Sequence, residues 1–342
     1  MQHLLNLTHD DLKAWFAERG LKAFHAGQVR RWLFGKRAGG FDEMTELGRP
    51  LRSRLAEYFR IWATTVAAVE AADDGSEKLL LELDDGHRVE CVLLSDDRGH
   101  RTACISTQVG CAMGCAFCAS GLGGLARNLT AGEIVEQLLR LQRHLPGDER
   151  LSRVVVMGVG EPLSNLDRLL AALDSATAAD ALGISARRVT ISTVGLPEGI
   201  RRLAEADCRY HLAVSLHAPD DDLRNRLVPA NRKIGIAAIL AAADDYFAAT
   251  GRRVTYEYVL LGSVNDRPLD ARRLVDLLKG RTALINLIPY NLVAELPFQT
   301  PAAETSARFA EILQQGGLTV KIRHRKGNRI GAACGQLRRS HA

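Results

Sequence analysis

The sequence Thr102-Ala-Cys-Ile-Ser-Thr-Gln-Val-Gly-Cys111-Ala-Met-Gly-Cys115-Ala-Phe-Cys118 joins an apolar, strand-like run to three closely spaced cysteines. Three thiolates so close together can bind one soft metal centre. A structural zinc site takes four protein ligands, and no fourth cysteine or histidine stands near Cys118. The spacing therefore predicts a three-ligand iron–sulfur site with one open position. Two alternatives stay open, namely zinc with a distant fourth ligand and three coincidental core cysteines.

Strands alternate with helices after this stretch, which is typical of βα units and a parallel sheet. The clearest helix begins at Thr130, whose hydroxyl can cap it while Glu133 bonds back. Six or seven βα repeats predict an α/β fold, a partial or full (β/α) barrel over residues 99–323, with an open doubly wound sheet as the competitor. In both, the chemistry lies at the carboxyl ends of the strands. The predicted strands are 102–106, 153–157, 188–193, 211–216, 254–260, 283–289 and 319–323.

Two smaller parts precede this core. Residues 1–60 predict a small helical domain, because Thr8 and Asp11 can begin a helix and apolar residues recur at helical spacing. Residues 61–98 predict a β-meander linker, since three strand-like runs are separated by two Asp-Gly turns. The polar side of the helical domain is expected to present Arg30, Arg31, Lys36 and Arg37.

Composition places the chain among ordinary globular proteins. Of its 342 residues 46% are hydrophobic and 25% charged, and no apolar run is long enough for a membrane span. The start of the chain does not resemble a signal peptide, so we expect a cytoplasmic protein without a membrane partner. Seven cysteines, three of them crowded together, do not fit a secreted disulfide framework.

The net charge of +5 is unevenly distributed. Residues 1–60 carry a net charge of +4 and residues 319–342 carry +7, which leaves −6 for the other 258 residues. Clustered Lys and Arg side chains at both ends predict contact with a polyanion such as nucleic acid. A solvated surface with a loose basic tail is the alternative.

Several motifs, taken in order along nearly the whole chain, resemble the RlmN/Cfr-type radical S-adenosylmethionine (SAM) methyltransferases, which methylate adenosine in ribosomal RNA. Each motif alone is weak, whereas their joint order is specific. Besides the three cysteines, the matching stretches are Phe24-His-Ala-Gly-Gln28 through Phe41-Asp-Glu-Met-Thr45, Met157-Gly-Val-Gly-Glu161-Pro-Leu-Ser-Asn165, Thr193-Val-Gly195, Ser215-Leu-His217-Ala-Pro219, Asn286-Leu-Ile-Pro-Tyr-Asn291 and Ala332-Ala-Cys334-Gly-Gln-Leu337.

The resemblance implies radical chemistry, and the substrate explains the need for it. C2 of adenine is electrophilic and has no lone pair with which to attack a sulfonium methyl group. Members of the family first move a methyl group from SAM to a cysteine. A second SAM molecule, cleaved with an electron from the cluster, gives a 5′-deoxyadenosyl radical that activates this methyl group for addition to the base. A second cysteine then resolves the adduct and forms a disulfide. The implied cofactors are one [4Fe–4S] cluster and SAM.

The resemblance also assigns roles to residues of this chain. Cys334 matches the methyl-carrying cysteine, Cys104 the resolving cysteine and Glu90 the proposed proton acceptor. The implied cluster ligands are Cys111, Cys115 and Cys118. The implied cofactor contacts are Gly160, Glu161, Ser192, Ser215, Leu216, His217 and Asn291.

The roles of the remaining cysteines and of the basic tail are predicted from the neighbouring residues in the sequence. Cys91 and Cys208 lie in apolar segments and are predicted to be core residues. The tail over 324–342 carries Cys334. Basic neighbours are expected to favour its thiolate and to lie near RNA phosphates. These neighbours are Arg323, His324, Arg325, Lys326 and Arg329.

We therefore expect methylation of C2 of an adenosine in 23S ribosomal RNA, and also in transfer RNA. A monomer that receives electrons from a low-potential donor such as flavodoxin is expected to carry it out. Pro162 favours the C2 branch of the family over the C8 branch. The alternatives are C8 methylation of the same adenosine and an RNA-binding iron–sulfur sensor without turnover. Retention of Glu90, Cys104 and Cys334 argues against the sensor, which needs only the cluster.

Two departures from the family pattern concern the substrate. The loop from Gly327 to Gly331 lacks the acidic residues that family members carry there, and Asn291-Leu-Val replaces the usual Asn-Pro-Phe. Both lie close to predicted site residues in the sequence. The reaction type is therefore better supported than the choice between C2 and C8.

Overall fold

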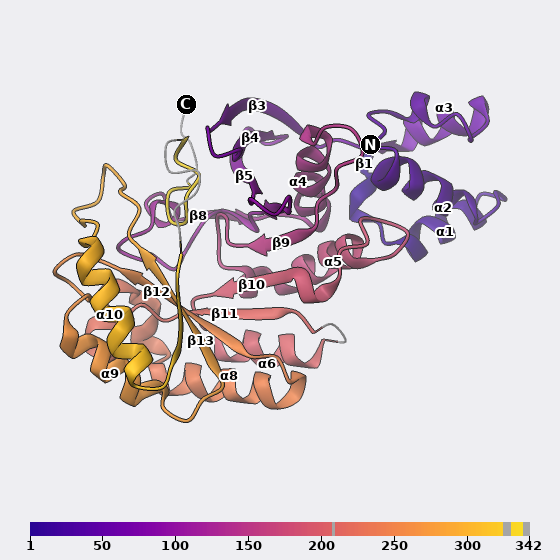
Figure 1. The fold of residues 1–342 in the computed structure, drawn as a ribbon. Helices are drawn as coiled ribbons and strands as arrows, with labels where there is room; N and C mark the ends of the chain where they lie inside the picture. The colour runs from indigo at the N-terminus through magenta and orange to yellow at the C-terminus, as the bar shows by residue number, and fades with distance from the viewer. Residues whose placement is uncertain (207–208, 324–329, 338–342) are drawn as a thin grey trace.

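A ten-stranded sheet organises the computed structural model, which describes residues 1–206, 209–323 and 330–337 (Figure 1). Three antiparallel strands form one side of the sheet and seven parallel strands the other. In spatial order the strands are β3 (Thr64–Ala71), β4 (Glu77–Leu83), β5 (Arg88–Ser95), β6 (Arg101–Cys104), β9 (Arg153–Val156), β10 (Val189–Thr193), β11 (His211–Ser215), β12 (Val254–Leu260), β13 (Ala283–Pro289) and β14 (Thr319–Ile322).

The parallel strands follow one another in space in the order of the sequence. A doubly wound sheet reverses its strand order at a switch point, so this competitor is excluded. Helices between the strands lie outside the curved sheet, and Figure 1 shows α6, α8 and α9 along one side of it. Because β3 and β14 are the two edges of the sheet, the barrel is partial. The predicted α/β barrel is thus confirmed in its partial form.

The predicted meander belongs to the same sheet. Strand β5 pairs antiparallel with β6, with Val92 opposite Cys104. The two Asp-Gly turns form as expected, since Gly75 and Gly86 have φ angles of 73° and 78°, which favour glycine. Residues 64–95 therefore extend the sheet of the barrel, while the predicted division of the chain into domains stays a prediction.

The helices agree with the periodicity of the sequence. Thr130 and Glu133 form the predicted capping box of α4, and Thr8 and Asp11 form that of α1. No helix among the described residues is long and apolar enough to cross a membrane. The helices are α1 (His9–Ala17), α2 (His25–Arg30), α3 (Arg49–Tyr58), α4 (Ala131–His144), α5 (Leu166–Thr177), α6 (Pro197–Glu205), α7 (Asp221–Leu227), α8 (Ile236–Thr250), α9 (Pro268–Leu278) and α10 (Ala303–Gln315).

Short elements complete the chain. Two small sheets pair β1 (Gln2–His3) with β2 (Phe59–Arg60) and β7 (Gln108–Gly110) with β8 (Leu125–Asn128). Single helical turns are η1 (Leu4–Asn6), η2 (Arg31–Gly35), η3 (Phe41–Glu43), η4 (Ala119–Gly121), η5 (Pro162–Asn165), η6 (Ala186–Arg188) and η7 (Pro229–Lys233).

The basic side chains expected on the surface of the N-terminal helical part have partners within the chain. Arg30 is buried and forms an ion pair with Asp180 at 2.8 Å, so its predicted place on the polar side is wrong. Arg31 and Lys36 both pair with Glu46. Arg37 donates to backbone carbonyl groups in the loop after α4. These four cations therefore serve internal contacts, two of which join the helical part to the barrel.

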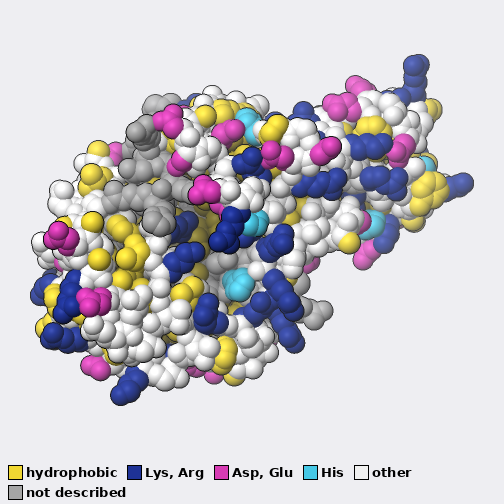
Figure 2. Space-filling model, in the orientation of Figure 1, with side chains coloured by type: hydrophobic (Ala, Val, Ile, Leu, Met, Phe, Trp, Pro, Cys, Tyr) yellow, Lys and Arg dark blue, Asp and Glu magenta, His cyan; other side chains and the backbone are white. Residues whose placement is uncertain are grey.

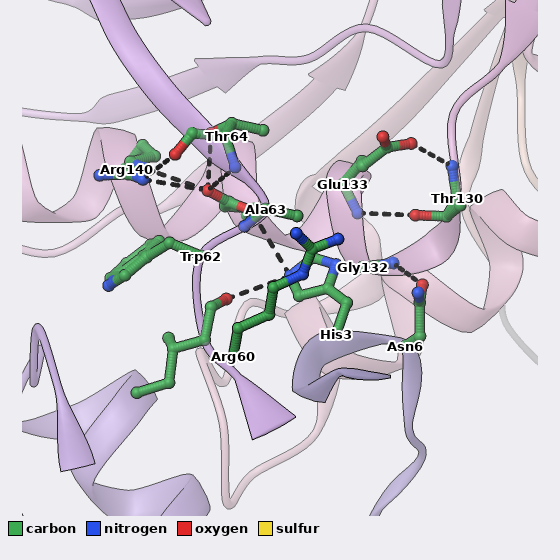
Figure 3. Close-up of polar contacts among 12 residues, drawn as sticks. His3, Asn6, Arg60, Trp62, Ala63, Thr64, Thr130, Gly132, Glu133 and Arg140 are labelled. Atoms are coloured by element: carbon green, nitrogen blue, oxygen red, sulfur yellow. Dashed lines mark hydrogen bonds and ion pairs between the residues drawn. The ribbon is translucent and has the colours of Figure 1, made fainter. Parts of the chain in front are cut away.

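A buried polar cluster holds the N-terminal part against the barrel, and Figure 3 labels its members His3, Ala63, Thr64 and Arg140. Its centre is the buried carboxylate of Glu136 in α4. The Glu136 carboxylate accepts hydrogen bonds from the backbone N–H groups of Ala63 and Thr64 and from the Thr64 hydroxyl. Arg140, one turn later, pairs with the same carboxylate. His3 approaches from β1, with Nε2 3.4 Å from Glu136 Oε2. We call these five residues the junction cluster.

The first turn of α4 receives the N-terminal segment closely. The Gly132 N–H donates to Asn6 Oδ1 at 2.7 Å, and a Cβ on Gly132 would lie 2.6 Å from His3 Nδ1. Only glycine therefore lets His3 approach this helix. Burial lowers the pKa of His3 against the opposing effect of Glu136, so the imidazole is neutral at pH 7.

Candidate active site

The cysteine loop lies beyond the carboxyl end of β6, between β7 and β8. Cys111, Cys115 and Cys118 all line one cavity, which we call the central cavity. A backbone hydrogen bond connects the loop to α7, because the Ala116 N–H donates to the carbonyl of Leu227 at the end of that helix. The three cysteines thus line the same cavity, and their role as ligands of one cluster stays a prediction.

The donor set fits a cluster better than a single ion. Burial raises the pKa of Cys111 to about 11 and also raises the pKa values of Cys115 and Cys118, so without a metal all three remain thiols. Within the described ranges, no three or more His, Cys, Asp or Glu side chains converge on a point where one metal ion could sit. In a [4Fe–4S] cluster each cysteine binds a different iron, so three cysteines can hold it, whereas a structural zinc site takes four protein ligands.

The turn after β9 forms the wall opposite the cysteines. Gly160 has a φ of 111°, and a Cβ there would lie 2.6 Å from the Gln108 Cβ. Gln108 also accepts the Glu161 N–H at 2.8 Å. The Glu161 carboxylate is buried and accepts three hydrogen bonds, from Leu163, Thr193 and Val194. A carboxylate has about four acceptor positions, so one remains for a ligand in the cavity.

The ends of β10 and β11 supply hydroxyl groups and a histidine. Ser192 and Ser215 line the central cavity with their oxygens 3.5 Å apart. His217 is buried, accepts the Val259 N–H at Nδ1, and has its pKa lowered to about 3 by burial and by Arg224. Its imidazole is therefore neutral and carries its proton on Nε2. Leu216 lies in the core outside this lining.

Asn291, after β13, connects the cavity with the C-terminal segment. Its Nδ2 donates to the Cys334 carbonyl at 3.1 Å. Its Oδ1 is buried without a hydrogen-bond partner among the described residues. Because an unpaired buried acceptor costs about 1–3 kcal/mol, it points to a donor on a bound ligand. The amino and hydroxyl groups of SAM are such donors, so the lining fits this cofactor.

Residues 330–337 contact the cysteine loop and lie near β8 in Figure 1. The Ala119 N–H donates to the Gly335 carbonyl, and the Ser120 hydroxyl donates to the Leu337 carbonyl. These contacts fix Cys334 between two cavities. It lines the central cavity and also a second cavity that contains Cys104, which we call the thiol cavity.

Cys104 and Cys334 differ in environment. Burial, with a smaller contribution from Cys334, raises the pKa of Cys104 to about 12. Arg323 lines both cavities, and its own pKa is raised chiefly by the Cys334 thiolate. Both thiols are free, so a disulfide between them remains a prediction about the reaction cycle. The other basic neighbours predicted for Cys334, from His324 to Arg329, lie outside the described residues.

Glu90 and Cys91 lie side by side in β5 with different environments. Glu90 lines neither cavity; it pairs with Lys78 at 3.1 Å and lines a separate hollow together with Gly331. Cys91 is a buried core residue, as predicted, and burial raises its pKa. Cys208 lies outside the described residues.

Two residues of the site were missed by sequence analysis. Glu257 of β12 lines the central cavity, is buried, and accepts a hydrogen bond from Asn286. Its burial raises its pKa. A charged residue inside an apolar strand was the available signal. Arg224 of α7 is fully buried and donates to the carbonyls of Val194, Ser215 and Leu216, at the ends of β10 and β11. Nothing in its sequence context marks it.

Comparison with known proteins identifies the family. Residues 2–61 match the ribosomal RNA large subunit methyltransferase N-terminal domain, and residues 105–275 match the radical SAM superfamily. The chain is 59% identical, over 99% of its length and 91% of the relative, to the probable dual-specificity RNA methyltransferase RlmN of Rhodopirellula baltica. The chain belongs to the RlmN family.

Two further comparisons agree. The probable dual-specificity RNA methyltransferase RlmN of Symbiobacterium thermophilum is 46% identical, over 98% of this chain and 91% of that protein. The crystal structure of a radical SAM methyltransferase from Sphaerobacter thermophilus superposes with a TM-score of 0.96 at 41% identity, and covers 98% of this chain and 99% of that one. The predictions of family, fold and an RNA-methylating radical SAM enzyme are confirmed.

Proposed function

We propose that this chain methylates C2 of adenosine in 23S ribosomal RNA and in transfer RNA, with Cys334 as the methyl carrier. The observation that carries the proposal is the position of Cys334, which lines both the central cavity and the thiol cavity. A methyl carrier must meet the methyl donor on one side and the resolving thiol on the other. Family membership supports the same assignment.

The central cavity has residues for both cofactors. Cys111, Cys115 and Cys118 would hold a [4Fe–4S] cluster. Glu161, Ser192, Ser215 and Asn291 would hold the polar groups of SAM. When bound, the cluster and SAM supply a methyl group and a hydrogen-abstracting radical.

The two catalytic thiols are distinguished by their surroundings. Cys334 is partly exposed and lines the central cavity together with Arg323. Cys104 is buried with its pKa raised to about 12, so it remains a thiol and does not compete for methylation. After the methyl carbon has joined the base, the Cys104 sulfur attacks the Cys334 sulfur. The S–S bond forms as the C–S bond breaks, and the proton of the Cys104 thiol completes the methyl group on the base. The C2 hydrogen leaves as a proton, for which Glu90 is the proposed acceptor, and as an electron, which would return to the bound cluster.

Mass spectrometry of RNA digests tests the function. RNA from cells that lack the gene should lose 2-methyladenosine in both 23S ribosomal RNA and transfer RNA, and expression of the gene should restore it. Appearance of 8-methyladenosine instead would establish the C8 alternative. No change in either nucleoside, with a loaded cluster, would contradict the enzyme and favour the sensor.

The cluster ligands are tested separately. After anaerobic reconstitution, Cys111→Ala, Cys115→Ala and Cys118→Ala should each bind less iron and lose the electron paramagnetic resonance signal of the reduced cluster. Cys91→Ala is the control, since this core cysteine lies outside the central cavity. A normal cluster in any one of the three variants would refute that ligand.

We further propose a low-potential electron donor such as flavodoxin and a cytoplasmic monomer. A reducing compartment suits three thiolate ligands and two catalytic thiols. Gel filtration with light scattering checks the monomer, and reduction of the cluster by purified flavodoxin checks the donor.

A further inference from the structure

The amino-terminal edge of the parallel strands carries a concentration of arginines, at the opposite end of the strands from the active site. Arg187 and Arg188 immediately precede β10, Arg209 precedes β11, and Arg252 and Arg253 precede β12. We call these five residues the arginine edge. Figure 2 shows dark-blue side chains gathered in this part of the surface, near the start of β11 in Figure 1.

Strand register brings these arginines together. Val154 pairs with Val189, and Thr190 with His211. Arg153, Arg188 and Arg209 therefore lie at or just before the starts of three neighbouring strands. On the next strand Ala213 pairs with Thr255, which places Arg253 opposite His211. Neighbouring strands are about 4.8 Å apart, so these cations form a row rather than scattered charges.

The row is not neutralised within the described part of the chain. No side chain of the arginine edge makes an ion pair or hydrogen bond there, and all except Arg252 are exposed. Two carboxylates of nearby segments are already engaged, Asp180 with Arg30 and Asp244 with Arg281. Among the described residues no ion pair therefore offsets the positive charge of the edge.

The pKa of His211, which lies at this edge, is affected by the positive charge. The pKa of His211 is lowered first by burial and then by Arg252 and Arg253. Like charges held at such spacing repel one another, and a polyanion removes that repulsion. The edge also uses arginine only; its planar guanidinium forms paired hydrogen bonds to phosphate, which an ammonium group does not.

The location links the arginine edge to the N-terminal helical part. The ion pair of Arg30 with Asp180 joins α2 to the loop that leads into β10. An RNA chain in contact with the helical part could thus continue along the strand edge. We propose that the arginine edge is a second RNA contact, which binds phosphate groups outside the nucleotide that is methylated. This inference rests on the proposed RNA methyltransferase function, and its partner is the same RNA.

A triple substitution with a matched control tests the surface. Arg188→Gln, Arg209→Gln and Arg253→Gln, combined in the full-length chain, should weaken binding of purified transfer RNA at least tenfold at low salt. The slope of log affinity against log salt should become shallower by about two to three, because each lost phosphate contact contributes about 0.7–0.9. The control combines Arg168→Gln, Arg272→Gln and Lys279→Gln, which remove the same charge from exposed positions on and beside the helices. It should leave affinity and slope close to those of the unaltered chain.

The outcomes separate this inference from the proposed function. Cleavage of SAM without RNA should be the same in all three proteins. If the unaltered chain methylates adenosine and the triple variant binds RNA like the control, the arginine edge is refuted while the function stands. If the unaltered chain makes no methyladenosine, the function fails whatever the variants do. Loss of binding to phosphatidylglycerol vesicles, with RNA binding retained, would overturn the RNA assignment in favour of a membrane surface.

Discussion

In the proposed mechanism Cys104 and Cys334 act on opposite sides of one covalent intermediate, so their variants should fail differently. Cys334→Ala has no atom to receive the methyl group and should form neither methyl-enzyme nor product. Cys104→Ala retains methyl transfer and addition to the base but lacks the thiol that releases the adduct. It should be purified with RNA covalently attached at Cys334. An excess of ultraviolet absorbance and an RNA-modified peptide in mass spectrometry would reveal the adduct.

The double variant is the control for this experiment, since without Cys334 it should carry no RNA. Cys91→Ala provides a second control, because this buried cysteine lies in β5 outside both cavities. Normal turnover by Cys104→Ala, or equal absence of RNA in the two single variants, would show that the roles are assigned wrongly.

Arg224 predicts a stability effect at the floor of the site. Replacement by Met leaves the carbonyls of Val194, Ser215 and Leu216 without their donor, although it also removes the desolvation cost of a buried charge. We expect Arg224→Met to lower the free energy of unfolding by about 2–4 kcal/mol in urea denaturation of the apo protein. Arg224→Lys should lose less, since an ammonium group still donates to part of this set.

Arg226 supplies the matched control on the same helix. It is exposed on α7, so Arg226→Met should change stability by less than about 0.5 kcal/mol. If Arg224→Met and Arg226→Met unfold at the same urea concentration, the three carbonyl contacts do not stabilise the fold.

Individual site residues were predictable where chemistry leaves a sequence pattern. The spacing of Cys111, Cys115 and Cys118 is a local signal, and the motif around Glu161 is another. Arg224 gave no such pattern, and Glu257 showed only a charge within an apolar strand, because their importance depends on burial and on partners from other elements. The ion pair of Glu90 with Lys78 also could not be predicted from the sequence, since it arises from the pairing of β4 with β5.

At the scale of elements, β12 and β13 were predicted to the residue, whereas β6, β9 and β11 end one or two residues before the predicted position. The difference has a physical cause. Apolar periodicity continues past the last ladder pair, but there the backbone turns to present polar groups to the central cavity. Strand interiors are set by local pattern, and strand ends are set by the site.

The turn after β9 leaves no room for a side chain at the carboxyl end of this strand. Gly160→Ala would place a Cβ 2.6 Å from the Gln108 Cβ at a φ of 111°. We expect a loss of at least about 2 kcal/mol of unfolding free energy and weaker SAM binding, because the wall that carries Glu161 must shift. Urea denaturation and equilibrium dialysis with labelled SAM would measure the two effects.

Gly183→Ala is the control for Gly160→Ala, because it introduces backbone strain at a positive φ without steric crowding of the added Cβ. Gly183 has a φ of 64° but open space where a Cβ would be added, so substitution should cost only about 1 kcal/mol and leave SAM binding unchanged. Equal losses of SAM binding in the two variants would mean that close packing against Gln108 is unimportant.

At the scale of the whole molecule, segment charge was a poor guide to surface charge. The N-terminal 60 residues carry net positive charge, yet three of their cations form ion pairs within the chain. Arg30 pairs with Asp180, and Arg31 and Lys36 both pair with Glu46. The middle of the chain sums to a negative charge, yet the register of four strands gathers the arginine edge there. A sum along the chain cannot distinguish paired charge from exposed charge, because pairing is decided by the fold.

The junction cluster predicts how acid affects the whole molecule. His3 has a folded-state pKa below its unfolded value, so the unfolded chain binds more protons once the pH falls below about 6.5. The stability contributed by neutral His3 is thus present above pH 6.5 and is lost as the pH falls toward the folded-state pKa. The loss approaches about 1.4 kcal/mol per pH unit within that window. Urea unfolding at pH 7.5 and pH 5.5 should show a smaller difference for His3→Gln than for the unaltered chain.

Other groups titrate in the same range, so the comparison between variants carries the test. His217 has its pKa lowered to about 3 and adds an acid-labile contribution, while Glu161 and Glu257, with raised pKa values, act in the opposite direction. These groups are common to all variants and cancel in the difference. Asn6→Ala removes the neighbouring hydrogen bond to Gly132 without removing a titratable group, so it should lower stability equally at both pH values. A His3→Gln variant with the full pH dependence of the unaltered chain would exclude His3 as a source of acid sensitivity.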